Sequence, residues 1–426
     1  MIKYNRFVLE NGLRVLVHTD KTTPIAAINV LYDVGSRDED QERTGFAHLF
    51  EHLMFGGSAN IPKYDEPLEI AGGENNAFTN SDITNYYLTL PVQNLETGFW
   101  LESDRMLSLA FTEKSLDVQR NVVSEEFRQV YLNQPYGDTW LLLRDLAYKV
   151  HPYQWPTIGK DISHIQNAKM KDVKDFFRRF YCPNNAILVV AGNVTPEQVR
   201  ELAEKWFGKI PRGPENRRDI PQEPLQTEAR ALTVYRQVPQ NAIYKAYHCC
   251  SRFDKEYYTV DLLSDALSLG NSSRLYQSLV KERNLFSEIN AYITVELDNG
   301  LFIISGRVSE GISVEEADNA IAAEIDKVKG EFLSISEMVK LKNKVESRIA
   351  FSNTSVLNKA MNLAFAELMG KPNLVNKEFG KYKVVNRVDI REQANIIFRD
   401  GNCSTLYYLV EQPEMQRQKT KERMRK

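Results

Sequence analysis

A proline-rich, charged segment near the middle of the chain, WFGKIPRGPENRRDIPQEPLQT from Trp206 to Thr227, separates two long stretches of regular hydrophobic pattern. Its four prolines and two glycines are typical of an extended linker between domains. The 426 residues also exceed what one hydrophobic core usually holds. We therefore predict a domain at residues 1–208, a linker at 209–228, a second domain at 229–414, and a basic, solvated tail at 415–426.

The two halves resemble each other. Segments 31–53 and 246–267 both read as a strand, a polar turn, a threonine that can cap a helix, and an amphipathic helix. A second pair of similar strand-like stretches begins at Asn76 and Asn290. These parallels predict an internal duplication.

Three polar residues of the first half stand where the second half has apolar ones. The trio is His48, Glu51 and His52, and its counterparts are Leu263, Ala266 and Leu267. Polar groups at positions where a repeated helix carries core residues need a specific reason.

Strand-like and helix-like segments alternate through both halves. Buried strands are predicted at 185–193 and 300–308, and long helices at 114–132 and 313–333. This mixture predicts an α+β fold class, in which each half is a mostly antiparallel sheet with helices packed on one face.

The composition excludes several classes of protein. A net charge of −3 lacks the basic excess of nucleic-acid-binding proteins, so no nucleic-acid partner is predicted. No apolar run reaches the roughly 18 residues that a membrane-spanning helix needs. The first residues, MIKYNRFVLENGLRVLV, alternate like a strand and lack the apolar core of a secretory signal. We therefore expect a cytoplasmic location, or a periplasmic one if a leader was removed.

The stretch HLFEH places two histidines four residues apart, with a glutamate directly before the second. On a helix, His48 and His52 share a face and can direct both imidazoles to one point. Glu51 is offset by roughly 100° from His52 and can approach a metal-bound water without binding the metal. This is the H-x-x-E-H arrangement of inverted zinc peptidases. The alternative is an amphipathic helix with hydrogen-bonded histidines, and a third ligand would decide between the two.

Two adjacent glutamates, Glu125 and Glu126 in VVSEEF, are candidates for that ligand. The apolar positions of the surrounding helix are Leu116, Val118, Val122, Val123, Phe127 and Val130. Their mean direction lies about 40° from Glu126 and about 140° from Glu125. Glu126 is therefore predicted to project from the buried face, where a carboxylate needs a metal or a cation.

Five motifs of the chain resemble a known peptidase family. They are HLFEHLMFGG (48–57), GGENNAFTNSDITNYYLTLP (72–91), VVSEEF (122–127), YCPNNAILVVAGNV (181–194) and LGNSSRLYQSLVKERNLFSEINAY (269–292). The chain is similar to the pitrilysin/insulinase family of inverted-motif zinc peptidases, in the half-length branch of the mitochondrial processing peptidase beta subunit and bacterial homologues.

The resemblance implies a processing-peptidase-like fold and a zinc metalloendopeptidase that cleaves extended peptides or unfolded segments in a closed chamber. One Zn²⁺ would be held by His48, His52 and Glu126, with Glu51 as the general base. The strand that contains Asn76, Ala77 and Phe78 would bind substrate by accepting it as an additional strand.

Two sites depart from the family pattern. Gln119 stands where the family commonly has a second glutamate, and we expect it to hydrogen-bond to a metal ligand. Val280 and Ser287 stand where the family has an arginine and a tyrosine that complete the active site. The resemblance therefore implies a heterodimer with a homologous subunit that supplies this pair, in preference to a homodimer. The competing hypothesis is a non-catalytic subunit that holds peptides or has a structural role.

Overall fold

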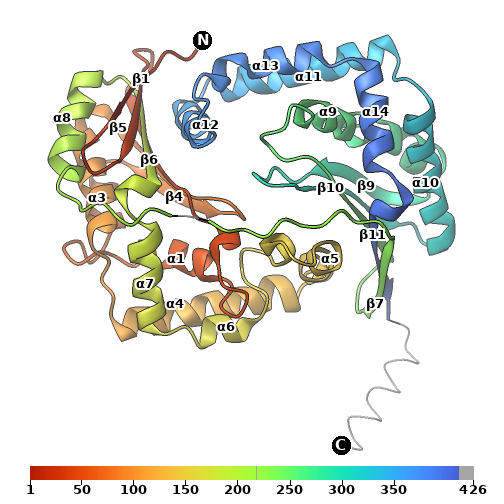
Figure 1. Cartoon of the computed structure of the whole chain (residues 1–426), viewed down its shortest axis with the longest axis horizontal. Coiled ribbons are helices and arrows are strands. Elements are labelled where there is room, and N and C mark those ends of the chain that lie inside the picture. The colour runs from red at the N-terminus through yellow and green to blue at the C-terminus, as the bar shows by residue number, and fades with distance from the viewer. Residues whose placement is uncertain (217, 412–426) are drawn as a thin grey trace, which may run out of the picture. The chain divides into compact units, whose positions relative to one another are not determined.

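The computed structural model describes residues 1–216 and 218–411, which form two compact units (Figure 1). Unit 1 comprises Met1–Phe127, Trp155–Pro221 and Glu346–Phe379, and the rest of the chain belongs to unit 2. The predicted tail at 415–426 lies outside the described residues. Within the described residues, no helix is both long and apolar enough to cross a membrane.

Unit 1 is built on a six-stranded sheet with the order β1-β2-β6-β3-β5-β4. Only the β2–β6 pair is parallel, and every other pair is antiparallel. The strands are β1 (Asn5–Val8), β2 (Arg14–Thr19), β3 (Ile25–Tyr32), β4 (Glu74–Thr79), β5 (Thr84–Pro91) and β6 (Ala186–Gly192). Strand β4 is the last strand in this order, so one of its edges has no partner strand among the described residues of the unit.

Helices cover both faces of this sheet, because successive residues of a strand point to opposite sides. Leu31 of β3 packs in one cluster with Leu363 of α12, whereas Ile28 lies against Gly98 of α3. The helices of unit 1 are α1 (Phe46–Phe55), α2 (Asp65–Ile70), α3 (Leu95–Leu107), α4 (Glu113–Glu126), α6 (Ile162–Gln166), α7 (Met170–Phe180), α8 (Pro196–Phe207) and α12 (Val356–Leu368).

Unit 2 contains a five-stranded sheet with the order β7-β11-β8-β10-β9. The strands are β7 (Arg230–Arg236), β8 (Ala242–His248), β9 (Phe286–Ile293), β10 (Leu301–Val308) and β11 (Cys403–Val410). Its helices are α5 (Thr139–Ala147), α9 (Tyr257–Ser268), α10 (Val314–Gly330) and α14 (Arg387–Ile397), while α11 (Ile335–Ser352) and α13 (Leu374–Val384) run from one unit into the other. These mixed layers confirm the α+β class predicted from the sequence, but helices cover both faces of the unit 1 sheet and not one face as predicted.

The two sheets repeat the same plan. The order β2-β6-β3-β5-β4 in unit 1 matches β7-β11-β8-β10-β9 in unit 2, and the β7–β11 pair is parallel like β2–β6. Helices α1 and α9 follow equivalent strands, and Asn76 and Asn290 lie on the equivalent edge strands β4 and β9. This repetition agrees with the internal duplication inferred from the sequence.

The units do not follow the halves of the sequence. Helix α5 lies before the linker but packs on β7, β8 and β11 of unit 2. Helix α12 lies after the linker but packs on β2, β3 and β6 of unit 1. Each half of the chain thus gives one helix to the other unit, so the compact units differ from the contiguous ranges 1–208 and 229–414. Hydrophobic pattern identifies such a helix but does not reveal which sheet it covers.

Candidate metal site

Helix α1 carries the H-x-x-E-H stretch. Six of its ten residues are buried and fix its rotation: Phe46, Ala47, Leu49, Phe50, Leu53 and Met54. His48, Glu51 and His52 are only half-buried. Their counterparts in α9 are all buried. The same helix position is therefore core in unit 2 and a partly accessible polar site in unit 1.

The third predicted ligand, Glu126, is the last residue of α4, which packs beside α1 and continues into the π-helical turn η3 (Phe127–Leu132). His52 Nε2 lies 3.3 Å from Glu126 Oε2, and His48 Nε2 lies 3.7 Å from Glu126 Oε1. One ligand atom from each of these three residues lies within 4.8 Å of the others. The structure thus brings together side chains that are more than seventy residues apart in sequence.

This arrangement fits a zinc ion. Ligand atoms at zinc's usual distances of about 2.0–2.2 Å lie roughly 3.3–3.5 Å from one another in a tetrahedron. The two distances to Glu126 are close to that spacing, and two imidazoles with one carboxylate are a donor set typical of catalytic zinc. Three protein ligands would leave a fourth position for water.

The electrostatics of the three residues favour the forms that bind metal. Burial lowers the pKa of His48 to about 4, so its imidazole is neutral at neutral pH. The hydrogen bond with His52 lowers the pKa of Glu126, which favours its carboxylate. Neutral imidazole and ionised carboxylate are the species that coordinate zinc.

The structure places Glu126, and not Glu125, beside the histidines. Glu126 is half-buried and Glu125 is exposed, in the order that the helical period gave. The predicted buried face was nevertheless partly wrong, because Val118, Val122 and Val130 are all more than 40% exposed. Helical periodicity predicted the relative directions of the two glutamates correctly. It could not predict which part of the apolar face is covered by other elements.

Glu51 precedes His52 on α1 and interacts electrostatically with both His52 and Glu126. Thr79 at the end of β4 donates a hydrogen bond from Oγ1 to Glu51 Oε2 at 2.6 Å. Burial raises the pKa of Glu51, which makes the carboxylate a stronger base than an exposed glutamate. Thr79 lies in the motif NNAFT, but it was not predicted as a site residue because nothing in the sequence pattern pairs it with Glu51.

Strand β4 offers its open edge next to this site. The Ala77 backbone N–H donates to the Asn76 side-chain oxygen at 2.8 Å, and therefore not to the neighbouring strand β5. Asn76 and Phe78 are exposed, and Ala77 is half-buried. The three predicted substrate-binding residues thus lie on an edge that has both backbone donors and accessible side chains.

Gln119, Val280 and Ser287 complete the set of predicted positions. Gln119 is half-buried and lies near Gly56 at the end of α1, but among the described residues it makes no hydrogen bond to His48, His52 or Glu126. Val280 lies in the π-helical segment η6 (Tyr276–Glu282). The Ser287 hydroxyl, on β9, donates to Gln240 Oε1 at 3.1 Å. Neither Val280 nor Ser287 can replace a guanidinium or a phenol.

Models of two related families match the sequence. The model described as Insulinase (Peptidase family M16) covers residues 14–159, and the one described as Peptidase M16 inactive domain covers residues 167–345. The first range contains His48, Glu51, His52 and Glu126, whereas Val280 and Ser287 fall in the second.

Known proteins match most of the chain in sequence, and a solved structure matches its fold. The zinc protease PqqE of Helicobacter pylori is 30% identical over 416 residues, which are 95% of this chain and 92% of that protein. A probable mitochondrial-processing peptidase subunit beta from Arabidopsis thaliana is 23% identical over 357 residues, which are 80% of this chain and 66% of that protein. The crystal structure of a protease from H. pylori superposes with a TM-score of 0.90 at 29% identity, covering 96% of this chain and 100% of the other.

Proposed function

Because this chain belongs to the insulinase family of peptidases, family M16, we propose that it is a zinc-dependent endopeptidase that cleaves extended peptides or unfolded segments. The observation that carries this proposal is the convergence of His48, His52 and Glu126, with Glu51 beside them. A scaffold protein would have no use for a half-buried base next to three metal-ligating groups.

We assign the chemical roles as follows. One Zn²⁺ bound by the two histidines and Glu126 would supply Lewis-acid chemistry, which polarises the scissile carbonyl and makes the attacking water more acidic. Glu51 accepts the proton of that water and can pass it to the leaving amine. Thr79 occupies Glu51 Oε2, so that Oε1 remains for proton transfer. The His48 imidazole is neutral at neutral pH because burial lowers its pKa.

Substrate would bind along β4. An extended peptide can pair with the open edge of this strand through backbone hydrogen bonds, which demand little of the peptide's sequence. The Ala77 N–H would be one donor, and the peptide would displace the Asn76 side chain that now accepts from it. This mode favours unfolded substrates over folded ones, since a folded protein rarely offers a free strand.

We further propose that the active enzyme is a heterodimer with a homologous subunit, which closes the chamber and supplies the missing arginine and tyrosine. Val280 and Ser287 at the corresponding positions support this, as does the likeness to a processing-peptidase subunit. A non-catalytic, peptide-holding role is the alternative, and the same missing pair is the observation that favours it.

The partner requirement can be measured directly. We expect the purified chain alone to bind zinc but to cleave a quenched-fluorescence peptide at a rate close to background. Addition of a homologous subunit encoded in the same organism should raise the rate by about 100-fold or more, because orientation of substrate is worth several kcal/mol. Full activity of the chain as a homodimer would exclude the heterodimer, and no activity with any homologue would favour the non-catalytic role.

Thr79 provides a finer test of the base. Thr79→Val keeps the shape of the side chain but removes the donor to Glu51, and we expect kcat to fall roughly tenfold, the effect of losing one hydrogen bond to a charged group. KM should change little, because the Thr79 hydroxyl bonds to the base. Thr79→Ser retains a hydroxyl and should recover most of the activity. Equal losses in both variants would indicate that the packing of the whole side chain, and not the hydrogen bond alone, matters.

A further inference from the structure

Helix α1 begins without a cap of its own. Its N-cap residue is Gly45, whose φ of 88° lies in the left-handed region and which has no side chain to accept a hydrogen bond. The backbone N–H groups of the first turn have no partner within a helix and need an acceptor from elsewhere. His48 is the third residue of this turn, so its position depends on how firmly the turn is held.

The missing cap is supplied by Glu39, a buried carboxylate earlier in the chain. Glu39 Oε1 accepts from the Ala47 N–H at 2.8 Å, and Oε2 accepts from the Gly45 N–H at 2.8 Å. The indole Nε1 of Trp155 donates to Oε2 at 3.1 Å. Glu39 is only 8% exposed, and burial raises the pKa of its carboxyl group to about 8, while the three N–H donors oppose that rise by stabilising the carboxylate.

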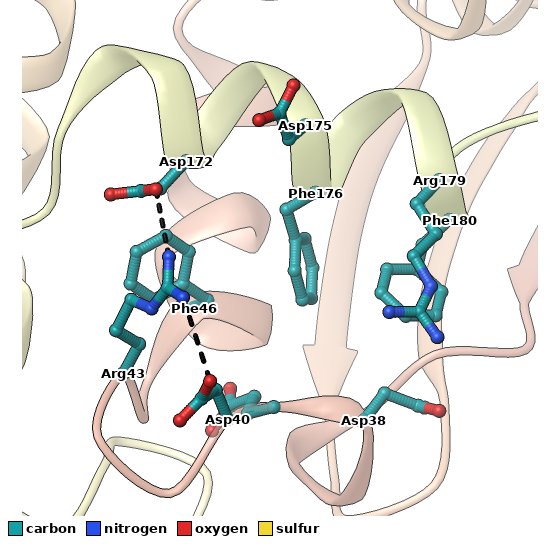
Figure 2. Close-up of a pocket in the computed structure, with 10 residues that line it drawn as sticks. Asp38, Asp40, Arg43, Phe46, Asp172, Asp175, Phe176, Arg179 and Phe180 are labelled. Atoms are coloured by element: carbon teal, nitrogen blue, oxygen red, sulfur yellow. Dashed lines mark hydrogen bonds and ion pairs between the residues drawn. The ribbon is translucent and has the colours of Figure 1, made fainter. Parts of the chain in front are cut away.

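The loop that carries Glu39 is itself fixed at both ends. On one side Arg37 forms an ion pair with Asp82 at 2.8 Å, and both side chains are buried. On the other side Arg43 forms ion pairs with Asp172 of α7 at 2.9 Å and with Asp40 at 3.6 Å. Dashed lines in Figure 2 mark both contacts. Glu39 is therefore presented to α1 by a loop that ion pairs hold on both sides, in the manner of a preorganised support.

We propose that Glu39 is a positioning residue for the zinc site, which holds the first turn of α1 so that His48 Nε2 faces Glu126. This inference rests on the proposed function insofar as the metal is zinc. Glu39 touches neither the metal ligands' side chains nor the substrate edge, and it acts only through the backbone of α1. Without it, the first turn frays, and metal binding must reorder that turn.

The test compares Glu39→Gln with two matched controls. The amide of glutamine can accept one of the helix N–H groups, but its NH₂ faces the other, so the cap is broken without loss of volume. Glu42→Gln makes the same chemical change at an exposed glutamate of the same loop. Thr195→Ala removes the side-chain cap of α8 in the same unit and measures the effect of losing a cap remote from the site.

Zinc affinity, measured by competition with a chromophoric chelator, is the main readout. We expect Glu39→Gln to bind zinc roughly tenfold more weakly, in line with the typical value of a helix cap. Glu42→Gln and Thr195→Ala should bind zinc like the unmodified chain. Unchanged zinc affinity in Glu39→Gln, or an equal loss in Thr195→Ala, would overturn the inference.

Amide hydrogen exchange separates this inference from the proposed function. In the metal-free protein, the amides from Gly45 to Leu49 should exchange faster in Glu39→Gln, while those of α8 should not. If Glu39→Gln does not fold, Glu39→Asp, which keeps the carboxyl group but shortens the reach, should give the same pattern more weakly. Failure to cleave peptides would count against the proposed function alone, whereas unchanged exchange in the first turn of α1 would count against the role of Glu39 alone.

Discussion

Glu51→Gln is expected to lower the rate of peptide cleavage by about 10²–10⁴-fold while leaving zinc bound. That range is the usual contribution of a general base. Glutamine has the same shape and can still accept the Thr79 hydrogen bond, but it cannot take a proton from water. Metal content by atomic absorption and cleavage of a quenched peptide by the assembled enzyme measure the two quantities on the same sample.

The thermal stability of metal-free Glu51→Gln provides the control for this experiment. Burial raises the pKa of Glu51, so its ionised form lowers the stability of the metal-free protein at neutral pH. Glutamine removes that charge, and the melting temperature of the metal-free variant should therefore not fall. A variant that keeps its zinc and also cleaves at the normal rate would show that another group serves as the base.

Glu126→Gln should weaken zinc binding by about 100-fold or more. Groups that merely orient a ligand are worth about 10–100-fold in metal affinity, and a ligand itself is worth at least that much. The neighbouring Glu125→Gln is the matched control, because it makes the same chemical change on the same turn of α4 at an exposed position. Chelator competition on both variants gives the ratio directly.

Glu126→Gln and Glu125→Gln should also differ in peptide cleavage. The hydrogen bond between His52 and Glu126 lowers the pKa of Glu126, so this carboxylate is a competent ligand over the neutral range. Loss of peptide cleavage should therefore accompany loss of zinc in Glu126→Gln and should be partly reversed by excess zinc. Equal zinc affinities in the two variants would remove Glu126 from the ligand set.

The sequence was sufficient to predict α1 and the direction of Glu126, because both depend on helical periodicity alone. The contrast between His48 and its counterpart Leu263 also came from the sequence, since the duplicated half served as an internal reference. The hydrogen bond from Thr79 and the cap from Glu39 could not be predicted. Each of these contacts joins segments whose separation in space depends on how a strand or loop packs against α1. Neither contact produces a periodic pattern in the sequence.

For a related reason, the sequence did not reveal that α5 packs on the sheet of unit 2 and α12 on the sheet of unit 1. Both helices are amphipathic, and their patterns are satisfied equally well by either sheet. Which sheet each helix covers depends on the path of the chain between them. The sequence therefore predicted the α+β class correctly, but it did not predict that one helix from each half of the chain packs on the sheet of the other unit.

The packing of α5 and α12 has consequences for the synthesis and the proteolysis of the chain. A ribosome must synthesise α12, which ends at Leu368, before the sheet of unit 1 can bury the face that includes Leu16, Leu31 and Val189. A protease that nicks the segment between Gly213 and Gln226, where the described residues form no helix or strand, would produce two fragments that each retain a helix of the other's sheet. Such fragments should stay together through gel filtration and separate only in denaturant, so an intact elution volume is no proof of an intact chain.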